Sequence, residues 1–112
     1  MKKQDLEKLK RDLEISAKEL LGEKLLKVVL YGSYARGDFD SESDIDFALI
    51  SKITEKEISL YNDQIGQITS RVSIEYGILV SMLIISKESF DEYENSMPFY
   101  KNLIKEGKVL YG

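Results

Sequence analysis

Hydrophobic residues recur at three- and four-residue spacings near the start of the chain and gather in short runs further on. Residues 3–21 place leucine and alanine on one face of a helix, and Gly22 follows as its C-terminal stop. Residues 25–31 (LLKVVLY) are apolar and partly β-branched, which is typical of a strand. A short helix capped by Ser33 is predicted next, followed by a polar loop over residues 37–43.

The alternation of strands and helices continues in the middle of the chain. Residues 44–50 (DIDFALI) predict a second strand. Thr54 and Glu57 fit a capping box, which opens a helix with an apolar face that extends to Val72. Residues 78–86 (ILVSMLIIS) form a nearly continuous apolar run, so we expect a strand that is covered on both faces.

The last part of the chain predicts two short helices. Ser89 is placed to cap the first, and Pro98 begins the second, which stops at Gly107. Residues 109–111 end as a short extension or strand. The order α-β-α-β-α-β-α-α predicts an α/β fold, with a sheet and helices packed around it in a single domain over residues 1–112.

Composition limits the chemistry that is available. With 112 residues, of which 43% are hydrophobic, the chain can form one small globular core. No apolar run of about 18 residues and no signal sequence occur, so we expect a cytoplasmic protein without a membrane segment. Because the chain has no Cys and no His, a metal must bind to oxygen ligands, which favours Mg²⁺ or Mn²⁺.

The charge balance argues against a long nucleic acid as the main partner. The net charge is −4, and only three of the sixteen basic residues are arginine. Such a chain has little with which to neutralise a phosphate backbone, although a local basic patch stays open as an alternative.

Two aspartates provide the first candidate site. Asp44 and Asp46 are two residues apart on a predicted strand, so their side chains share a face, with α-carbons roughly 6–7 Å apart. Two such carboxylates can converge on one metal ion. Ser43 precedes them and can orient a carboxylate or a phosphate. The alternative interpretation is a solvated turn that leads into a strand.

The turn from Gly32 to Gly37 provides the second candidate site. Gly32 lets the backbone approach a ligand closely, and backbone N–H groups at a strand-to-helix turn bind phosphate oxygens. Ser33 can donate its hydroxyl to a phosphate, and Arg36 can supply a forked cation. The alternative is a plain junction with Ser33 as a cap and Arg36 in solvent. We interpret the tyrosines as packing residues, and only Tyr34 lies beside the turn.

Taken together, Gly-Ser-x-x-x-Gly and Ser-Asp-x-Asp resemble the nucleotidyltransferase superfamily that includes DNA polymerase β, and the small size resembles its minimal nucleotidyltransferase (MNT) branch. The resemblance implies a short mixed sheet flanked by helices and Mg²⁺-dependent transfer of a nucleoside monophosphate from an NTP. It implies that Gly32 and Ser33 bind the triphosphate, with Arg36 and Ser43 inside the same motifs. It implies that Asp44 and Asp46 are the catalytic metal ligands.

One part of the family pattern is missing. Active members of this family carry a third carboxylate on the next core strand, but residues 78–86 contain no acid, and Ser81 stands near the expected place. The nearest acids are Glu75 and Glu88. The sequence leaves open whether one of these, or a partner, completes the site.

The resemblance also suggests an acceptor. ATP as AMP donor and a helical HEPN-domain protein, modified as the toxin of a toxin–antitoxin pair, are what the family implies. A homo-oligomer or an apolar patch can provide the acceptor surface equally well. The alternatives are a non-catalytic nucleotide-binding module that neutralises its partner by occlusion, and transfer to a small cationic molecule.

Overall fold

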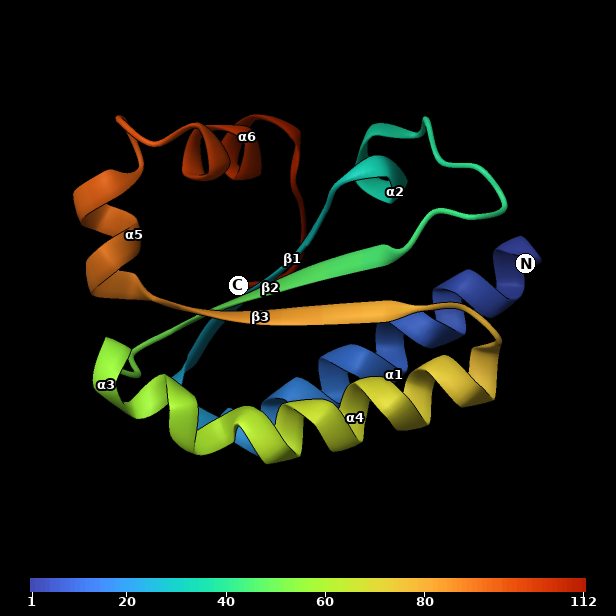
Figure 1. The fold of residues 1–112 in the computed structure, drawn as a ribbon, viewed down its shortest axis with the longest axis horizontal. Coiled ribbons are helices and arrows are strands. Elements are labelled where there is room, and N and C mark those ends of the chain that lie inside the picture. The colour runs from blue at the N-terminus through green and yellow to red at the C-terminus, as the bar shows by residue number, and fades with distance from the viewer.

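The computed structural model describes all of residues 1–112 and contains one sheet with helices on both sides (Figure 1). In chain order the helices and strands are α1 (Lys3–Leu21), β1 (Leu25–Tyr31), α2 (Ser33–Arg36), β2 (Ile45–Ser51), α3 (Glu55–Ile58), α4 (Asn62–Tyr76), β3 (Val80–Ser86), α5 (Lys87–Tyr93), α6 (Pro98–Glu106) and β4 (Lys108–Tyr111). None of the helices has the length and apolar character that crossing a membrane requires.

The sheet is mixed, with the strand order β3-β2-β1-β4. β1 pairs antiparallel with both β2 and β4, whereas β2 and β3 run parallel. A parallel pair needs a long crossover connection, and α3 and α4 form it. The predicted short mixed sheet flanked by helices is therefore confirmed.

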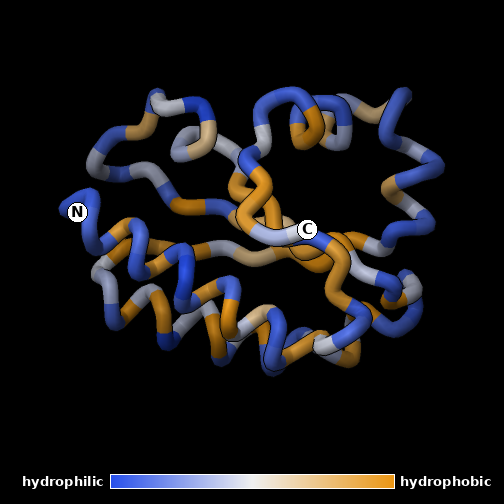
Figure 2. Tube along the Cα trace, turned by 180° about the vertical axis from the view of Figure 1, so that it is seen from behind, coloured by the Kyte–Doolittle hydropathy of each residue, from blue (hydrophilic) through white to orange (hydrophobic).

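The larger part of the core lies between one face of the sheet and the helices α1 and α4. Every second strand residue points to this face, as the period of a strand requires. The sheet contributes Val28, Leu30, Ile45, Phe47, Leu49, Val80, Met82 and Ile84. The helix α1 adds Leu9, Leu13 and Ala17. Figure 2 shows the result, with apolar strands at the centre and helices that alternate between polar and apolar positions.

The opposite face of the sheet is covered over only part of its length. A smaller core on this face consists of Val29, Ala48, Ile50 and Ile85 of the sheet together with Leu103 of α6. The helices α5 and α6 lie over this part, while α2 lies at the other end (Figure 1). The sheet surface near α2 consequently stays open to solvent.

This open surface corrects the prediction for β3. The strand is buried on both faces only near its C-terminal end, because it is an edge strand whose first half has no helix above it. Ser81 is exposed, and the side chain of Leu83 is 44% exposed. The apolar run in the sequence could not distinguish full burial from burial against α4 alone.

Several predicted boundaries also change. The single helix expected from the Thr54 capping box to Val72 is two helices, α3 and α4, joined by a 3₁₀ turn over Ser59–Tyr61, and β3 begins at Val80, two residues later than predicted. Asp44 lies just before β2, which begins at Ile45. The cap of α5 is Ser86, whose side chain accepts a hydrogen bond from the Ser89 N–H at 3.1 Å, so the predicted Ser89 cap is wrong. The Ser89 hydroxyl instead donates to Glu55 at 2.6 Å. The predicted bounds of α1 and β1, the Thr54 capping box and the start of the last helix at Pro98 are confirmed.

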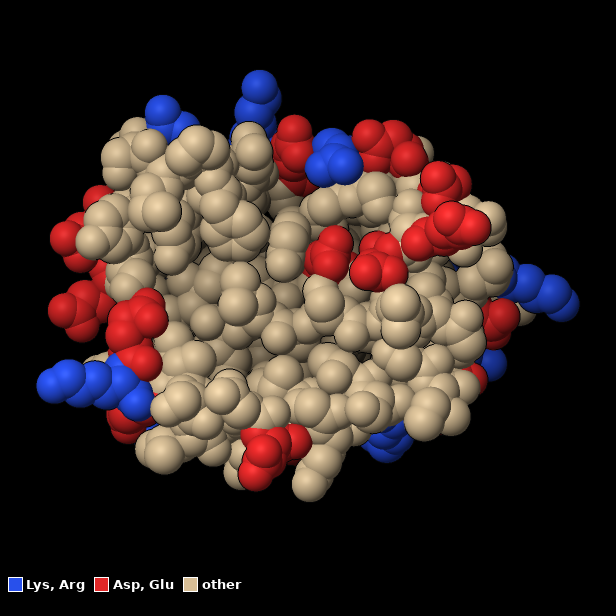
Figure 3. Space-filling view, viewed as in Figure 1, with Lys and Arg blue, Asp and Glu red and all other residues tan.

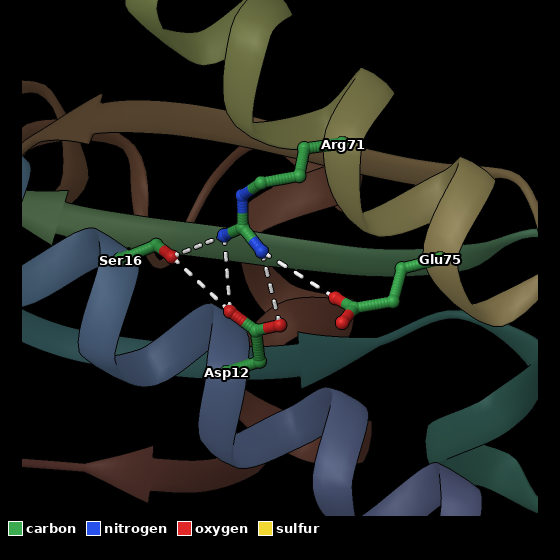
Figure 4. A network of polar contacts seen from close by, with 4 residues as sticks. All are labelled: Asp12, Ser16, Arg71 and Glu75. Carbon is green, nitrogen blue, oxygen red and sulfur yellow. Dashed lines mark hydrogen bonds and ion pairs between the residues drawn. The ribbon is translucent and has the colours of Figure 1, made fainter.

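A polar network joins the two helices below the sheet (Figure 4). Arg71 of α4 donates two hydrogen bonds to the carboxylate of Asp12 in α1, at 3.0 and 3.1 Å, and a third to the Ser16 hydroxyl at 2.8 Å. Glu75 lies 3.5 Å from the same guanidinium. The hydrogen bonds from Arg71 lower the pKa of Asp12, while burial acts in the opposite direction. The network ties α1 to α4.

We expect Asp12→Asn to lower the free energy of unfolding by about 1 kcal/mol at neutral pH, since a partly exposed ion pair is weakened by solvent. Because folding lowers the pKa of Asp12, the stabilisation is present above the ordinary value of 3.8 and is lost as the pH falls through the folded-state pKa. Urea unfolding at neutral pH and near pH 3 measures this. Glu19→Gln, which removes an exposed acid of α1 without an ion pair, is the control. A wild-type advantage that did not shrink in acid would contradict the expectation.

Candidate functional site

Three neighbouring strands bring Tyr31, Asp46 and Ser81 side by side at one end of the sheet. The register of β1 and β2 pairs Tyr31 with Asp46, and the register of β2 and β3 pairs Asp46 with Ser81. Residues that are paired across strands share a face of the sheet. This is the face away from α1 and α4, because the neighbouring residues Ile45, Phe47 and Val80 point into the core on the other face. The helix α2 lies at the same end of the sheet (Figure 1). Asp46 therefore lies at the centre of a small polar row.

The glycine of the turn is packed against this row. Gly32 directly follows β1 and has φ 76° and ψ −157°, a conformation that residues with a Cβ rarely adopt. A Cβ on Gly32 would lie 2.6 Å from Oδ2 of Asp46, which is too close for any real contact. The Gly-Ser turn and the Asp-x-Asp segment, separated in the sequence by a polar loop, are thus in direct contact.

The second oxygen of Asp46 is held from the other side. The Ser81 hydroxyl donates a hydrogen bond of 2.6 Å to Oδ1 of Asp46. Ser81 therefore stands where the sequence resemblance places a third carboxylate, and it supplies a neutral donor instead of an acid. The half-buried Asp46 carboxylate is fixed by one hydrogen bond and one close backbone approach.

Asp44 differs from Asp46 in its surroundings. It precedes β2, its side chain is exposed, and it takes part in no hydrogen bond or ion pair. The strand start is anchored by the next residue, because the Ile45 N–H donates to the carbonyl of Leu79 at 3.0 Å. One aspartate is thus rigidly held and the other is free to turn toward a ligand.

The start of α2 presents backbone donors beside this carboxylate. Gly32 occupies the cap position and its carbonyl accepts from the N–H groups of Ala35 and Arg36, both at 3.1 Å. No side chain caps the helix, so the predicted capping role of Ser33 is wrong. The first N–H groups of a helix, here those of Ser33 and Tyr34, have no acceptor within it. These groups and the Ser33 hydroxyl remain available to an anion.

Two further predicted residues are occupied by contacts within the protein. The Arg36 guanidinium pairs with Asp38 at 3.1 Å and reaches Glu106 of α6 at 3.4 Å. These partners raise the pKa of Arg36, and the hydrogen bond that Arg36 donates to Asp38 contributes most. The Ser43 hydroxyl accepts from the Asp40 N–H at 2.9 Å. Arg36 therefore joins α2 to α6, and Ser43 shapes the loop that leads to Asp44.

The two acids that sequence analysis named as substitutes lie elsewhere. Glu75 belongs to the network of α1 and α4 on the other side of the sheet (Figure 4). Glu88 lies two residues after Ser86, and Ser86 pairs with Ser51 of β2. Ser51 is five residues beyond Asp46, which is roughly 16 Å along the strand. Nowhere do three Asp, Glu, His or Cys side chains gather as a metal cluster. The site offers two carboxylates.

This donor set suits a particular kind of metal binding. Mg²⁺ takes oxygen ligands and is commonly bound by one or two carboxylates together with substrate phosphates. Asp44 and Asp46 match that pattern, and acidic side chains gather around α2 and the loop that follows it, with few basic ones among them (Figure 3). The residues therefore fit one magnesium ion that arrives with a nucleotide.

Tyr31 is a site residue that sequence reasoning treated as packing. Its ring lies edge-on to Phe99 of α6, with ring centres 5.6 Å apart. Burial raises its pKa, the negative charge of Asp46 adds to this, and the Ser81 hydroxyl acts in the opposite direction. The Tyr31 hydroxyl is therefore protonated at neutral pH. Only the strand register, which pairs Tyr31 with Asp46, could have identified it.

Comparisons with known proteins agree with this geometry. The model of a family described as the nucleotidyltransferase domain matches residues 7–111. A protein of Methanocaldococcus jannaschii that is provisionally named a protein adenylyltransferase is 32% identical over 88 residues, which is 79% of this chain and 80% of that protein.

Solved structures share the fold. A toxin–antitoxin crystal structure with AMP-PNP aligns with a TM-score of 0.64 at 20% identity, over 92% of this chain and 73% of the other. The complex of a tri-AMPylated Shewanella oneidensis HEPN toxin with its MNT antitoxin aligns with a TM-score of 0.59 at 18% identity, over 95% and 71% of the two chains. At these identities the likeness concerns the fold.

We expect Gly32→Ala to disturb Asp46, because the new methyl group takes the space of its Oδ2. Mn²⁺ binding, followed by electron paramagnetic resonance with ATP present, should weaken by about tenfold or more. Gly37→Ala is a matched control, since Gly37 also has a positive φ, of 85°, but its Cβ would meet only open space. Gly37→Ala, at a left-handed helical position, should lose about 1–2 kcal/mol of stability, and Gly32→Ala, in a φ/ψ region almost restricted to glycine, about 1–3 kcal/mol. Equal Mn²⁺ affinities in the two variants would contradict the predicted contact.

We also expect the hydroxyl of Ser81 to matter for ion binding. Ser81→Ala removes the hydrogen bond to Asp46, and the loss of such a supporting contact commonly lowers metal affinity by about 10–100-fold. Ser81→Thr keeps the hydroxyl and should retain most of the affinity. The same Mn²⁺ titration measures both variants. If Ser81→Ala bound Mn²⁺ as tightly as Ser81→Thr, the Ser81 hydroxyl would have no role in positioning Asp46.

Proposed function

This chain belongs to the nucleotidyltransferase domain family, and we propose that it transfers AMP from ATP to a hydroxyl group of a partner protein. The observation that carries the proposal is the Asp46 carboxylate, held between Gly32 and Ser81 beside the first N–H groups of α2. A fixed carboxylate next to free backbone donors is the arrangement that a nucleotide with its metal ion requires.

The reaction is an in-line displacement. The acceptor oxygen attacks the α-phosphorus, a new O–P bond forms, the bond to the bridging oxygen breaks, and pyrophosphate leaves. The acceptor hydroxyl loses its proton to water, which reaches the site because Ser81 and Leu83 are exposed beside Asp46. With no His in the chain, no imidazole can act as the base.

The turn binds the phosphates in this proposal. Gly32 lets the backbone approach, and the N–H groups of Ser33 and Tyr34 donate to phosphate oxygens together with the Ser33 hydroxyl. Ser43 holds the loop through Asp40 and so presents Asp44 to the substrate. These groups orient the α-phosphorus, and orientation supplies a large part of the rate when little covalent chemistry is asked of the protein.

Asp44 and Asp46 would hold Mg²⁺, or Mn²⁺, through their carboxylate oxygens. When bound, the ion neutralises charge on the phosphates and on the leaving pyrophosphate. Asp46 is positioned in advance by Gly32 and Ser81, whereas the exposed Asp44 turns in with the nucleotide. The division between one rigid and one mobile ligand suits an ion that enters together with its substrate.

For the acceptor we propose a helical HEPN-domain protein, with this chain as the antitoxin of a toxin–antitoxin pair. Support comes from solved structures of the same fold, which are described as toxin–antitoxin complexes, one with an AMPylated HEPN toxin. The surface beside the site is suited to a protein, because Leu83 and Met97 are exposed. Figure 3 shows this part of the molecule as largely uncharged.

One observation favours a second candidate function. Ser81 replaces an acid, which leaves two carboxylates and no group positioned to deprotonate an acceptor. A module of this kind can bind a nucleotide and neutralise its partner by covering it, without transferring AMP.

Label transfer separates the two functions. A HEPN-domain protein offered as acceptor, incubated with the chain, Mg²⁺ and ATP labelled at the α-phosphate, should become labelled, whereas γ-labelled ATP should give no label. Asp44→Asn/Asp46→Asn should reduce the labelling by about 10³-fold or more, because it removes both metal ligands.

The control is Glu19→Gln/Asp63→Asn, which changes the net charge equally at exposed acids of α1 and α4. It should label the partner like the wild type. Two results together would overturn AMP transfer: absence of label, and unchanged neutralisation of the partner by the Asp44→Asn/Asp46→Asn variant. The remaining function would then be neutralisation by covering the partner.

A further inference from the structure

A small cavity lies between α2 and α6, above the end of β1. Its volume is about 230 Å³, and its walls include Tyr31, Gly32, Arg36, Phe99, Asn102 and Glu106. That is larger than the roughly 150 Å³ that suffices for one benzene ring in a protein interior. The cavity can therefore accept a flat ring system.

The cavity adjoins the carboxylate site. Tyr31 is the strand partner of Asp46, and Gly32 is the residue on which the Asp46 carboxylate is packed. Both residues also line the cavity. A molecule with phosphates at the start of α2 would thus have the cavity next to it, across a wall that the two sites share.

The walls favour an uncharged aromatic group over another phosphate. Tyr31 and Phe99 meet edge to face with ring planes at 89° and present aromatic surface. The one cation, Arg36, is paired with Glu106 at 3.4 Å and with Asp38 at 3.1 Å, so its charge is already balanced. The carboxylate of Glu106 would also repel a phosphate group.

Asn102 is an exposed polar side chain at the wall of the cavity. The amide of Asn102 in α6 takes part in no hydrogen bond, although it carries two donors and an acceptor. An asparagine amide pairs with the N6 and N7 positions of adenine, where guanine presents two acceptors instead. The amide therefore provides a means to distinguish the two purines.

We propose that this cavity is the subsite for the nucleobase, with the ring of an adenine against Phe99 and Tyr31 and its N6/N7 edge on Asn102. The inference rests on the proposed function, which places the triphosphate at Gly32 and Ser33. It assigns to Arg36 the closure of the cavity through Glu106, in place of the phosphate contact that the sequence motif predicts.

The test compares three ligands by isothermal titration calorimetry in the presence of Mg²⁺, namely ATP, GTP and inorganic tripolyphosphate. The wild type should bind ATP more tightly than GTP or tripolyphosphate. Asn102→Leu should weaken ATP binding on the order of tenfold and bring the ATP and GTP affinities close together, with tripolyphosphate unchanged. Asn95→Leu, the same substitution outside this cavity, should behave like the wild type.

Phe99→Leu provides a second variant with a different chemical change. It keeps an apolar wall but removes the aromatic ring, so ATP and GTP should weaken together while tripolyphosphate does not. Unchanged ATP affinity and selectivity in both variants would overturn the subsite, as would a wild type that binds tripolyphosphate as tightly as ATP. A wild type that binds none of the three ligands would overturn the proposed function as well.

Discussion

The close approach of the Asp46 carboxylate to Gly32 is the contact on which the rest of the site depends. One oxygen occupies the space that a Cβ on Gly32 would fill, and the other accepts a hydrogen bond from Ser81. The contact joins three strands and the start of α2, because Gly32 connects β1 to α2, Asp46 lies in β2 and Ser81 lies in β3. A backbone that moved at any of these points would separate the carboxylate from the Gly32–Ser33 turn.

Burial on the opposite face of the sheet keeps this arrangement in register. A shift of one residue would exchange the faces of β2, and would bring the fully buried Ile45 and Phe47 to solvent and Asp46 into the core. Such a shift would cost the transfer energy of both apolar side chains, roughly 1.5–3 kcal/mol each, and bury a charge besides. The pairing of Arg71 with Asp12 adds to this by holding α1 and α4 together beneath the strands. Polar residues can therefore remain exposed on the face of the sheet away from α1 and α4, without a helix to cover them.

The parts of the molecule that were predictable from sequence are those encoded locally. The helix over residues 3–21 and the strand over residues 25–31 follow from spacing and composition, and the structure has the same bounds. The cap of α5 was assigned to the wrong serine, because Ser86 and Ser89 are both compatible with a helix start and only the end of β3 distinguishes them. The roles of Tyr31 and Ser81 depend on strand register, and the cavity lined by Asn102 depends on how α6 packs beside α2. Distances along the chain do not contain that information.

The neutral residue at position 81 has an electrostatic consequence for the whole site. A third carboxylate beside Asp46 would place like charges together in the absence of a cation, which raises carboxylate pKa values and lowers stability. The Ser81 hydroxyl avoids that repulsion and donates to Asp46 instead, at the cost of one oxygen ligand for a second ion. Ser81 also lies on β3, the edge strand of the sheet, with the exposed Leu83 next to it on the same face. The side of Asp46 that lacks an acid is therefore also its solvent-open side, because no helix covers the first half of β3 on this face.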